Sequence, residues 1–216
     1  MENNDTELVF IIDRSGSMGG FEDDTIGGFN SMLEKQKRVG EGLVYVTTVL
    51  FDGRSEMLHD RLPISEVRPM TREDYVPGGC TALLDTLGET ILHIGKIHRY
   101  AHPDHKPRNT VFVIITDGFE NASHTYTKDK IRETVKRKTE KYGWEFIFLG
   151  ANMDAIAAAR DIGIRHERAA NYEQTERGFT ECYEAMAAFV SAKRCCASVS
   201  TLNDWKRGLE DAEDDT

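Results

Sequence analysis

The sequence predicts an α/β fold with a doubly wound, mostly parallel central sheet that is flanked by helices on both faces. Three observations lead to this prediction. Short apolar runs, typical of strands buried on both sides, recur along the chain. Amphipathic segments with helical periodicity lie between them, which is the pattern of parallel strand–helix–strand units. The length of 216 residues suits a single domain with one substantial core.

Four segments are predicted to form the central strands, because each is a nearly continuous run of apolar residues. They are Leu8–Asp13, Leu43–Phe51, Thr110–Thr116 and Trp144–Gly150. Residues 53–76 differ, since polar and apolar side chains alternate there and Pro63 has no backbone N–H to donate. We therefore expect an edge strand or a hairpin in this segment.

Helices are predicted in the intervals between the strands. The clearest is the last one, where one face carries Phe179, Cys182, Tyr183, Met186, Ala187 and Val190. Similar spacing predicts helices over Glu22–Lys37, Leu83–Ile94, Ile131–Tyr142 and Asp154–Asp161. Residues 98–109 are predicted to form a polar loop. Its three histidines, His98, His102 and His105, are expected to be solvated rather than to bind zinc, because Pro103 interrupts any continuous helix there.

Charge narrows the function classes. The formal net charge of −10 argues against general nucleic-acid binding, which needs a cationic surface to displace phosphate counterions. The basic run at 128–142 is accordingly predicted to be the exposed side of a surface helix. The acidic residues Glu210–Thr216 are predicted to form a solvated, frayed end.

The cellular compartment of the protein is predicted from three features: the lengths of its apolar runs, its first residues and its cysteines. Runs such as Val111–Ile115 are far too short to cross a bilayer, so no membrane span is expected. Residues 1–7 are polar and acidic, unlike the start of a secretory signal, and a cytoplasmic location is expected. Reduced thiols are also expected, because no disulfide or zinc-knuckle spacing connects Cys80, Cys182, Cys195 and Cys196.

Three loops at the expected carboxyl edge of the sheet carry side chains with oxygen atoms. Asp13 ends the first strand, and Ser15 and Ser17 follow it at alternate positions. Thr81 stands at the start of a helix behind a glycine turn, and Asp117 ends another strand. Ligands of doubly wound sheets bind beyond this edge, so we expect these side chains to meet there.

Two carboxylates and three hydroxyls are hard oxygen donors, which suit Mg²⁺ or Mn²⁺ better than zinc, with Ca²⁺ as an alternative. Hydroxyls donate lone pairs without negative charge, so the cation would still attract a further carboxylate. Each piece alone has a plainer interpretation: Asp13 or Ser15 caps a helix, Thr81 is an N-cap, and Asp117 begins a turn. The conjunction of all of them favours a metal site.

These residues resemble the metal-ion-dependent adhesion site of the von Willebrand factor type A domain. The D-x-S-x-S motif of that family falls on Asp13, Ser15 and Ser17, its threonine loop on Thr81, and its second aspartate on Asp117. The resemblance extends to the segments IGGFNSML, TALLDTLGETI and FIFLGANMDA, the last typical of bacterial stand-alone members. It covers roughly residues 7 to 195 and implies that the first and fourth strands are neighbours, which would bring the two aspartates together.

The resemblance also implies a division of the chain. We expect a polar lead at residues 1–6, the von Willebrand factor type A domain at 7–197, and an acidic tail at 198–216. All five ligand positions of the family are filled, so the site is expected to bind metal. Cys80 stands between the glycine pair and Thr81, whereas in many relatives the threonine follows the glycines directly. A small buried thiol is expected there rather than a nucleophile at a helix start.

In this family the cation usually links two proteins, because an acidic residue of the partner completes the coordination. The resemblance implies that the serine and threonine ligands bind directly, and one or both aspartates through water. We therefore expect a metal-dependent protein-binding module without catalytic residues, nucleic-acid partner or membrane span. The alternatives are a metal-dependent phosphoryl or acyl hydrolase and a scaffold with an unused site. A hydrolase of the haloacid-dehalogenase type carries a D-x-D motif at this strand end, with a second carboxylate two residues after the first. Here Ser15 stands at that second position, which disfavours such a hydrolase.

The rim of the site is expected to select the partner protein. Five residues and the loop that continues through His124 flank the ligands at the same edge of the sheet. The five residues are Arg14, Met18, Phe21, Phe119 and Glu120. The two phenylalanines among them would offer apolar contacts to a partner, and the alternative for each is that it packs into the core.

Overall fold

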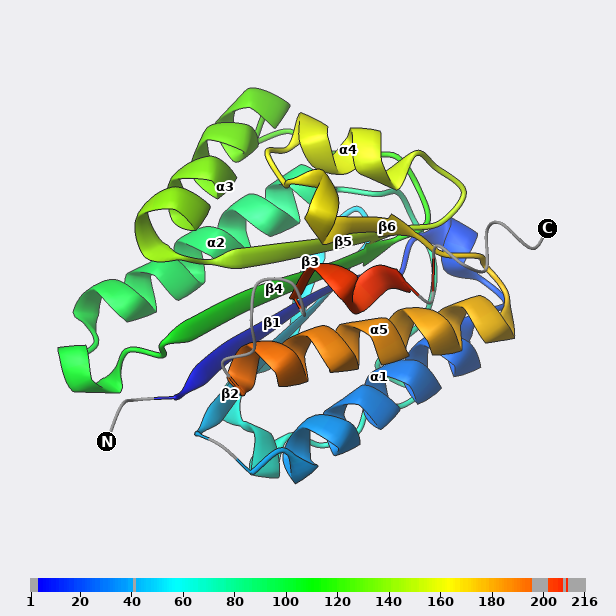
Figure 1. Cartoon of the computed structure of the whole chain (residues 1–216). Helices are drawn as coiled ribbons and strands as arrows, with labels where there is room; N and C mark the ends of the chain where they lie inside the picture. Colours follow the sequence, from blue (N-terminus) through cyan, green and yellow to red (C-terminus); the bar gives the residue numbers. More distant parts are fainter. Residues whose placement is uncertain (1–3, 41, 196–201, 208, 210–216) are drawn as a thin grey trace.

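The computed structural model describes residues 4–40, 42–195, 202–207 and 209. Its centre is one six-stranded sheet in the order β3-β2-β1-β4-β5-β6, with helices on both faces (Figure 1). Every neighbouring pair is parallel except β2 and β3. The predicted fold class is therefore confirmed. The strands are β1 (Thr6–Asp13), β2 (Val44–Phe51), β3 (Ser55–Pro63), β4 (Asn109–Thr116), β5 (Glu145–Gly150) and β6 (Ala169–Asn171).

Helices cover the two faces unequally (Figure 1). The helices are α1 (Glu22–Arg38), α2 (Leu83–Tyr100), α3 (Lys128–Tyr142), α4 (Ala155–Asp161) and α5 (Glu176–Arg194). α1 and α5 lie together on one face, while α2, α3 and α4 lie on the other (Figure 1). Each helix corresponds to one of the predicted amphipathic segments. The apolar stripe of each helix faces the sheet, which explains the helical spacing of its apolar residues.

The central strand β1 is buried along its whole length. Successive side chains of a strand point to opposite faces. Phe10 and Ile12 accordingly belong to the core under α1 and α5, whereas Val9 and Ile11 belong to the core under α2, α3 and α4. This two-sided burial explains why the strand is apolar at consecutive positions rather than at alternate ones.

The edges of the sheet differ in how well the sequence predicts them. β3 runs antiparallel to β2 with irregular register and ends at Pro63, as expected for an edge strand. β6 was not predicted. It has three residues, Ala169 to Asn171, and a strand of this length carries no periodicity that could be recognised.

The prediction of a polar loop over 98–109 is wrong at both ends. α2 continues to Tyr100, and β4 begins at Asn109. His98 lies on α2, where its Nε2 is 3.1 Å from Oε2 of Glu7 and its ring packs edge-on against Trp144. The histidine is therefore held by a carboxylate from β1 rather than being solvated.

Part of the segment assigned to the tail packs on the core. Leu202, Trp205 and Leu209 are buried, and the Trp205 ring meets Phe189 of α5 edge-on at 5.9 Å. The indole N–H of Trp205 donates to the carbonyl oxygen of Glu167 at 2.9 Å. Residues 210–216, for which a frayed end was predicted, lie outside the described residues, and the domain boundaries stay a prediction. Within the described ranges, none of the helices combines the length and the apolar composition needed to cross a bilayer.

Candidate metal centre

The two predicted aspartates come from neighbouring strands. β1 pairs with β4 in parallel, with Ile12 opposite Ile115, so both strands end at the same edge of the sheet. Asp13 is the last residue of β1, and Asp117 directly follows β4. The hydroxyl of Thr116, the last residue of β4, donates to Oδ2 of Asp13 at 2.6 Å. The implied neighbourhood of the first and fourth strands is thus present, and it brings both aspartates to one place.

The loop after β1 turns its serines back toward these aspartates. The backbone N–H of Ser15 donates to Oδ1 of Asp13 at 2.7 Å, which starts the turn. A short 3₁₀ helix follows at Gly16–Met18. Oγ of Ser15 lies 3.2 Å from Oγ of Ser17, whose hydroxyl donates to Oδ1 of Asp117 at 2.7 Å. The D-x-S-x-S spacing therefore places side chains of both strand ends in one hydrogen-bonded group.

Thr81 reaches the same place from a third loop. Its Oγ1 would lie 3.7 Å from a Cβ built on Gly118, and Oγ of Ser17 would lie 3.8 Å from the same point. The two hydroxyls thus lie beside Gly118, which directly follows Asp117. The five residues Asp13, Ser15, Ser17, Thr81 and Asp117 are called the candidate metal centre below.

Backbone hydrogen bonds fix the threonine loop against the serine loop. The N–H of Gly16 donates to the carbonyl oxygen of Gly79 at 3.2 Å, and the N–H of Gly78 donates to the carbonyl oxygen of Arg14 at 2.8 Å. Gly79 has a φ of +75°, a conformation that favours glycine. The glycine pair before Thr81 therefore provides both the turn and the docking of the loop.

Burial and charge suit a cation at this place. Asp13 is fully buried and Asp117 nearly so, while Ser17 is exposed and opens the group to solvent. Burial raises the pKa of Asp13, against the lowering effect of its hydrogen bonds with Thr116 and Ser15. Among the described residues, no lysine, arginine or histidine forms an ion pair with either aspartate. Two close carboxylates without a cationic partner, beside three hydroxyls, fit a hard divalent ion.

The hydroxyls are essential to this fit. In the described part of the chain, no three histidine, cysteine, aspartate or glutamate side chains form a group that could hold a metal ion. A metal at the candidate metal centre would thus depend on serine and threonine oxygens for most of its protein ligands.

Gln174 is a member of the site that the sequence did not indicate. It lies between β6 and α5, and its side-chain amide donates to Oδ2 of Asp117 at 2.9 Å and to the carbonyl oxygen of Ser17 at 3.2 Å. Its own Oε1 accepts from Asn152, which has a positive φ of 54°. A glutamine in a loop has no spacing signal, and only the return of the chain through β6, beside β5, brings it to this edge of the sheet.

Replacing Gln174 with alanine is expected to weaken Mn²⁺ binding by about tenfold or more, the usual effect of removing a group that orients a metal ligand. The amide holds one oxygen of Asp117 in place, and alanine cannot. Titration calorimetry with MnCl₂ measures the change. Asn152→Gly, which removes only the contact to Gln174, should have a smaller effect. Equal affinities for the Gln174 variant and the original chain would contradict the assignment.

The expected rim is only partly present. Met18 is fully buried, because the 3₁₀ turn directs it into the core, and Phe21 packs on Phe179 at a centroid distance of 5.5 Å. The prediction that Met18 lines the rim is therefore wrong. Phe119 is 64% exposed and stands beside Asp117 in sequence.

The two charged residues of the rim have structural partners. Arg14 pairs with Asp52 at 3.2 Å and with Glu56 at 2.7 Å. Glu120 accepts from the backbone N–H of Leu84 at 2.8 Å and so caps the start of α2. Their side chains are thus already engaged within the chain.

Cys80 also differs from expectation. Its side chain is exposed, not buried, because it follows the left-handed Gly79 on the outer side of the loop. Cys182 is a buried free thiol and Cys195 an exposed one. Cys196 lies outside the described residues.

Comparison with known proteins shows the fold. No family model matches the chain, and no curated protein matches it in sequence. Solved structures do match. A von Willebrand factor type A protein from Catenulispora acidiphila has a TM-score of 0.56 at 11% identity, over 87% of this chain and 43% of that one. Manganese-loaded TRAP protein from Plasmodium vivax has a TM-score of 0.53 at 16% identity, over 82% of this chain and 74% of that one.

A third similar structure is proximal thread matrix protein 1 from the mussel byssus, with a zinc-occupied metal-ion-dependent adhesion site (MIDAS) motif. Its TM-score is 0.58 at 15% identity, over 88% of this chain and 47% of that one. This chain spans less than half of the mussel and Catenulispora chains. The three likenesses show that the chain has the fold of von Willebrand factor type A domains.

Proposed function

We propose that this chain is a metal-dependent protein-binding module. In this proposal the candidate metal centre holds a divalent cation, with Mg²⁺ or Mn²⁺ preferred, and an acidic residue of a partner protein completes the coordination. The observation that carries the proposal is the pair of nearly buried aspartates, without a cationic partner among the described residues, beside three hydroxyl oxygens. The manganese-loaded and zinc-occupied proteins of the same fold support a divalent metal at such a site.

The donor set favours an incoming carboxylate. Hydroxyls contribute lone pairs without charge, so they lower the positive charge of the cation less than carboxylates would. Ser17 is exposed, which leaves a side of the group accessible from solvent. A carboxylate of a partner protein would therefore meet a cation that still attracts it.

Phe119 supports a protein partner rather than a small ion alone. It follows Gly118 at the edge of the candidate metal centre and is 64% exposed. An aromatic side chain beside a charged contact is a common anchor in protein interfaces. We propose that Phe119 packs against the residues that flank the partner's acidic side chain.

We also propose that the module is not an enzyme. The hydroxyls of Ser15 and Ser17 are hydrogen-bonded to each other and to Asp117, and no described histidine contacts them. The exposed thiol of Cys80 has no hydrogen bond to a described residue that could act as its base. A nucleophile with an adjacent base, the usual requirement of covalent hydrolysis, is therefore not supported.

Capture of a partner from a cell extract tests the function. The intact chain is expected to retain a partner protein when Mg²⁺ or Mn²⁺ is present and to release it when a chelator is added. The reason is that the bound cation supplies the contact to the partner's acidic residue. Asp13→Ala should capture nothing in either condition, and Phe119→Ala should capture less while still binding metal. Capture that is indifferent to metal and to Asp13→Ala would show that the binding surface lies elsewhere.

A further inference from the structure

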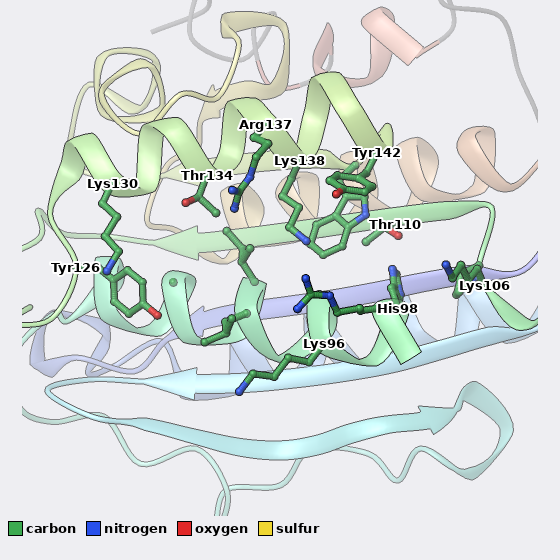
Figure 2. Close-up of a pocket in the computed structure, with 17 residues that line it drawn as sticks. Lys96, His98, Lys106, Thr110, Tyr126, Lys130, Thr134, Arg137, Lys138 and Tyr142 are labelled. Atoms are coloured by element: carbon green, nitrogen blue, oxygen red, sulfur yellow. The ribbon is translucent and has the colours of Figure 1, made fainter. Parts of the chain in front are cut away.

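A groove of about 790 Å³ runs between α2 and α3, on the side of the sheet away from α1 and α5 (Figure 2). One end lies at Gly88 and Tyr126, and the other at Tyr142 and Trp144. Thr110, the second residue of β4, also lines it. The groove therefore extends to the edge of the sheet opposite the candidate metal centre. A function of the groove does not depend on metal binding at that centre.

Two glycines of α2 open the groove. Gly88 and Gly95 are seven residues apart and so share a face of the helix. A Cβ at Gly88 would lie 2.5 Å from Cδ1 of Tyr126, and a Cβ at Gly95 would lie 2.7 Å from Nζ of Lys138. Glycine inside a helix costs about 1 kcal/mol relative to alanine. The chain thus gives up helix stability where Tyr126, which precedes α3, and Lys138 of α3 reach across to α2.

The lining of the groove is strongly cationic. It contains no aspartate or glutamate, whereas its basic residues are Lys96, His98, Arg99, Lys106, Lys130, Arg137 and Lys138. Among the described residues, no carboxylate forms an ion pair with Lys96, Arg99, Lys130, Arg137 or Lys138. This is unexpected in a chain with a net charge of −10.

The outer side of α3 differs from the groove in that three of its cations have carboxylate partners. There Lys128 pairs with Asp161 at 3.0 Å, and Arg132 pairs with Asp129 at 2.9 Å. Lys136 lies 3.9 Å from Glu140. Three solvent-facing cations of α3 therefore have carboxylate partners, whereas no ion pair to a described carboxylate forms at Lys130, Arg137 or Lys138, which line the groove.

Lys138 lies at the floor of the groove. Its Nζ is 4.0 Å from the centroid of the Trp144 ring and 5.1 Å from that of Tyr142 (Figure 2). The side chain is half-buried, and burial together with Arg137 lowers the pKa of its ammonium group. An anion in the groove would offset both effects, because it would supply the counter-charge that the chain does not.

We propose that this groove binds a small anion with two or more phosphate groups. Figure 2 shows Lys130, Arg137 and Lys138 extending from α3 toward α2, whereas Lys96 leaves α2 on the side away from α3. Arg99 of α2 also lines the groove. Cations from two walls suit a ligand with several negative charges, and guanidinium groups bind phosphate oxygens in pairs. The volume lies within the range of small-molecule sites, roughly 300–1,000 Å³.

A nucleic acid fits the surroundings less well. An extended phosphate backbone needs a continuous basic track. Beyond the groove, α3 presents the exposed carboxylates of Asp129, Glu133 and Glu140, which would repel such a backbone. A compact ligand meets only the cationic lining.

Calorimetric titration with sodium tripolyphosphate in chelator and about 150 mM salt tests the proposal without a contribution from the metal site. Saturable binding to one site is expected, with little heat from sulfate at equal ionic strength. Lys138→Met keeps most of the apolar stem but removes the charge, and it should weaken binding at least tenfold. Lys136→Met removes one charge from the outer side of the same helix and should change the affinity by less than twofold.

Thermal unfolding of both variants shows whether they remain folded, and Arg137→Gln provides a second test from an exposed position. It should weaken binding as Lys138→Met does. Three outcomes would overturn the proposal: no saturation at millimolar tripolyphosphate, equal loss in the Lys136 and Lys138 variants, or equal binding of sulfate. An RNA or acidic peptide that requires Lys138 while tripolyphosphate does not bind would also overturn it, in favour of that ligand.

Discussion

Replacing Asp117 with asparagine is expected to weaken Mn²⁺ binding by at least about 100-fold, the upper end of what losing a group that orients a metal ligand costs. The substitution removes one of the two negative charges of the candidate metal centre. Asparagine can still accept from Gln174 with its oxygen, and its amide can donate to the hydroxyl of Ser17, which then turns. The fold should therefore persist while the affinity for the cation is lost.

Thermal unfolding with and without MnCl₂ measures this loss. A cation at 100 times its dissociation constant stabilises the folded state by about 2.7 kcal/mol, and one bound 100-fold more weakly by about 0.4 kcal/mol. For a chain of this size, the first corresponds to a rise of about 5–10 °C in the unfolding temperature and the second to about 1 °C.

Asp154→Asn is the matched control for Asp117→Asn. Asp154 follows β5 near the same edge of the sheet and caps α4, where its Oδ1 accepts from the N–H of Ala157 at 2.8 Å. Asparagine caps helices as well as aspartate does, so this change removes a charge and little else. It should leave the response to Mn²⁺ intact. The same rise in Asp117→Asn as in the original chain would refute a cation at this site.

How far the sequence predicts the site depends on how local each signal is. Asp13, Ser15 and Ser17 lie within five residues, and the strand before them fixes where they stand. Thr81 and Asp117 are recognisable because each follows a local signal, a glycine turn or the end of a strand. The structure places all of them together, while binding of a metal to them stays a prediction.

The parts that could not be predicted depend on contacts between distant segments. Gln174 reaches Asp117 across 57 residues, and His98 reaches Glu7 across 91. Neither residue has a neighbour in sequence that indicates its partner. Met18 shows the opposite case, since its position between the ligands suggested the rim, but the 3₁₀ turn directs it inward. Side-chain direction in a loop follows from the turn, which sequence spacing alone does not specify.

The basic segment of α3 shows how packing changes the meaning of a charge pattern. The sequence predicted that this basic run is the exposed side of a surface helix. That prediction holds for Lys128, Arg132 and Lys136, which pair with carboxylates at the surface. Lys130 and Lys138 instead line the groove against α2. Helical spacing shows that such residues share a face, but only the neighbouring helix shows that this face borders a cavity.

The adjacent glycines of α1 are expected to respond in opposite directions to the same substitution. Gly27 is exposed, and a Cβ there would meet nothing within 4 Å. Gly27→Ala should therefore stabilise the chain by up to about 1 kcal/mol, because alanine favours the helix. A Cβ at Gly28 would lie 2.1 Å from Cδ2 of Tyr183, whose ring is buried on α5. Gly28→Ala should thus force α1 away from α5.

Overpacking of this kind typically costs about 1–3 kcal/mol, and so severe an overlap belongs at the upper end. After the gain in helix propensity, Gly28→Ala should be less stable than the original chain by about 2 kcal/mol. The two variants should then differ by about 3 kcal/mol, which urea unfolding resolves through the midpoint if the slope is unchanged. Equal midpoints would mean that Tyr183 moves aside freely, and that the close approach of α1 and α5 does not depend on Gly28.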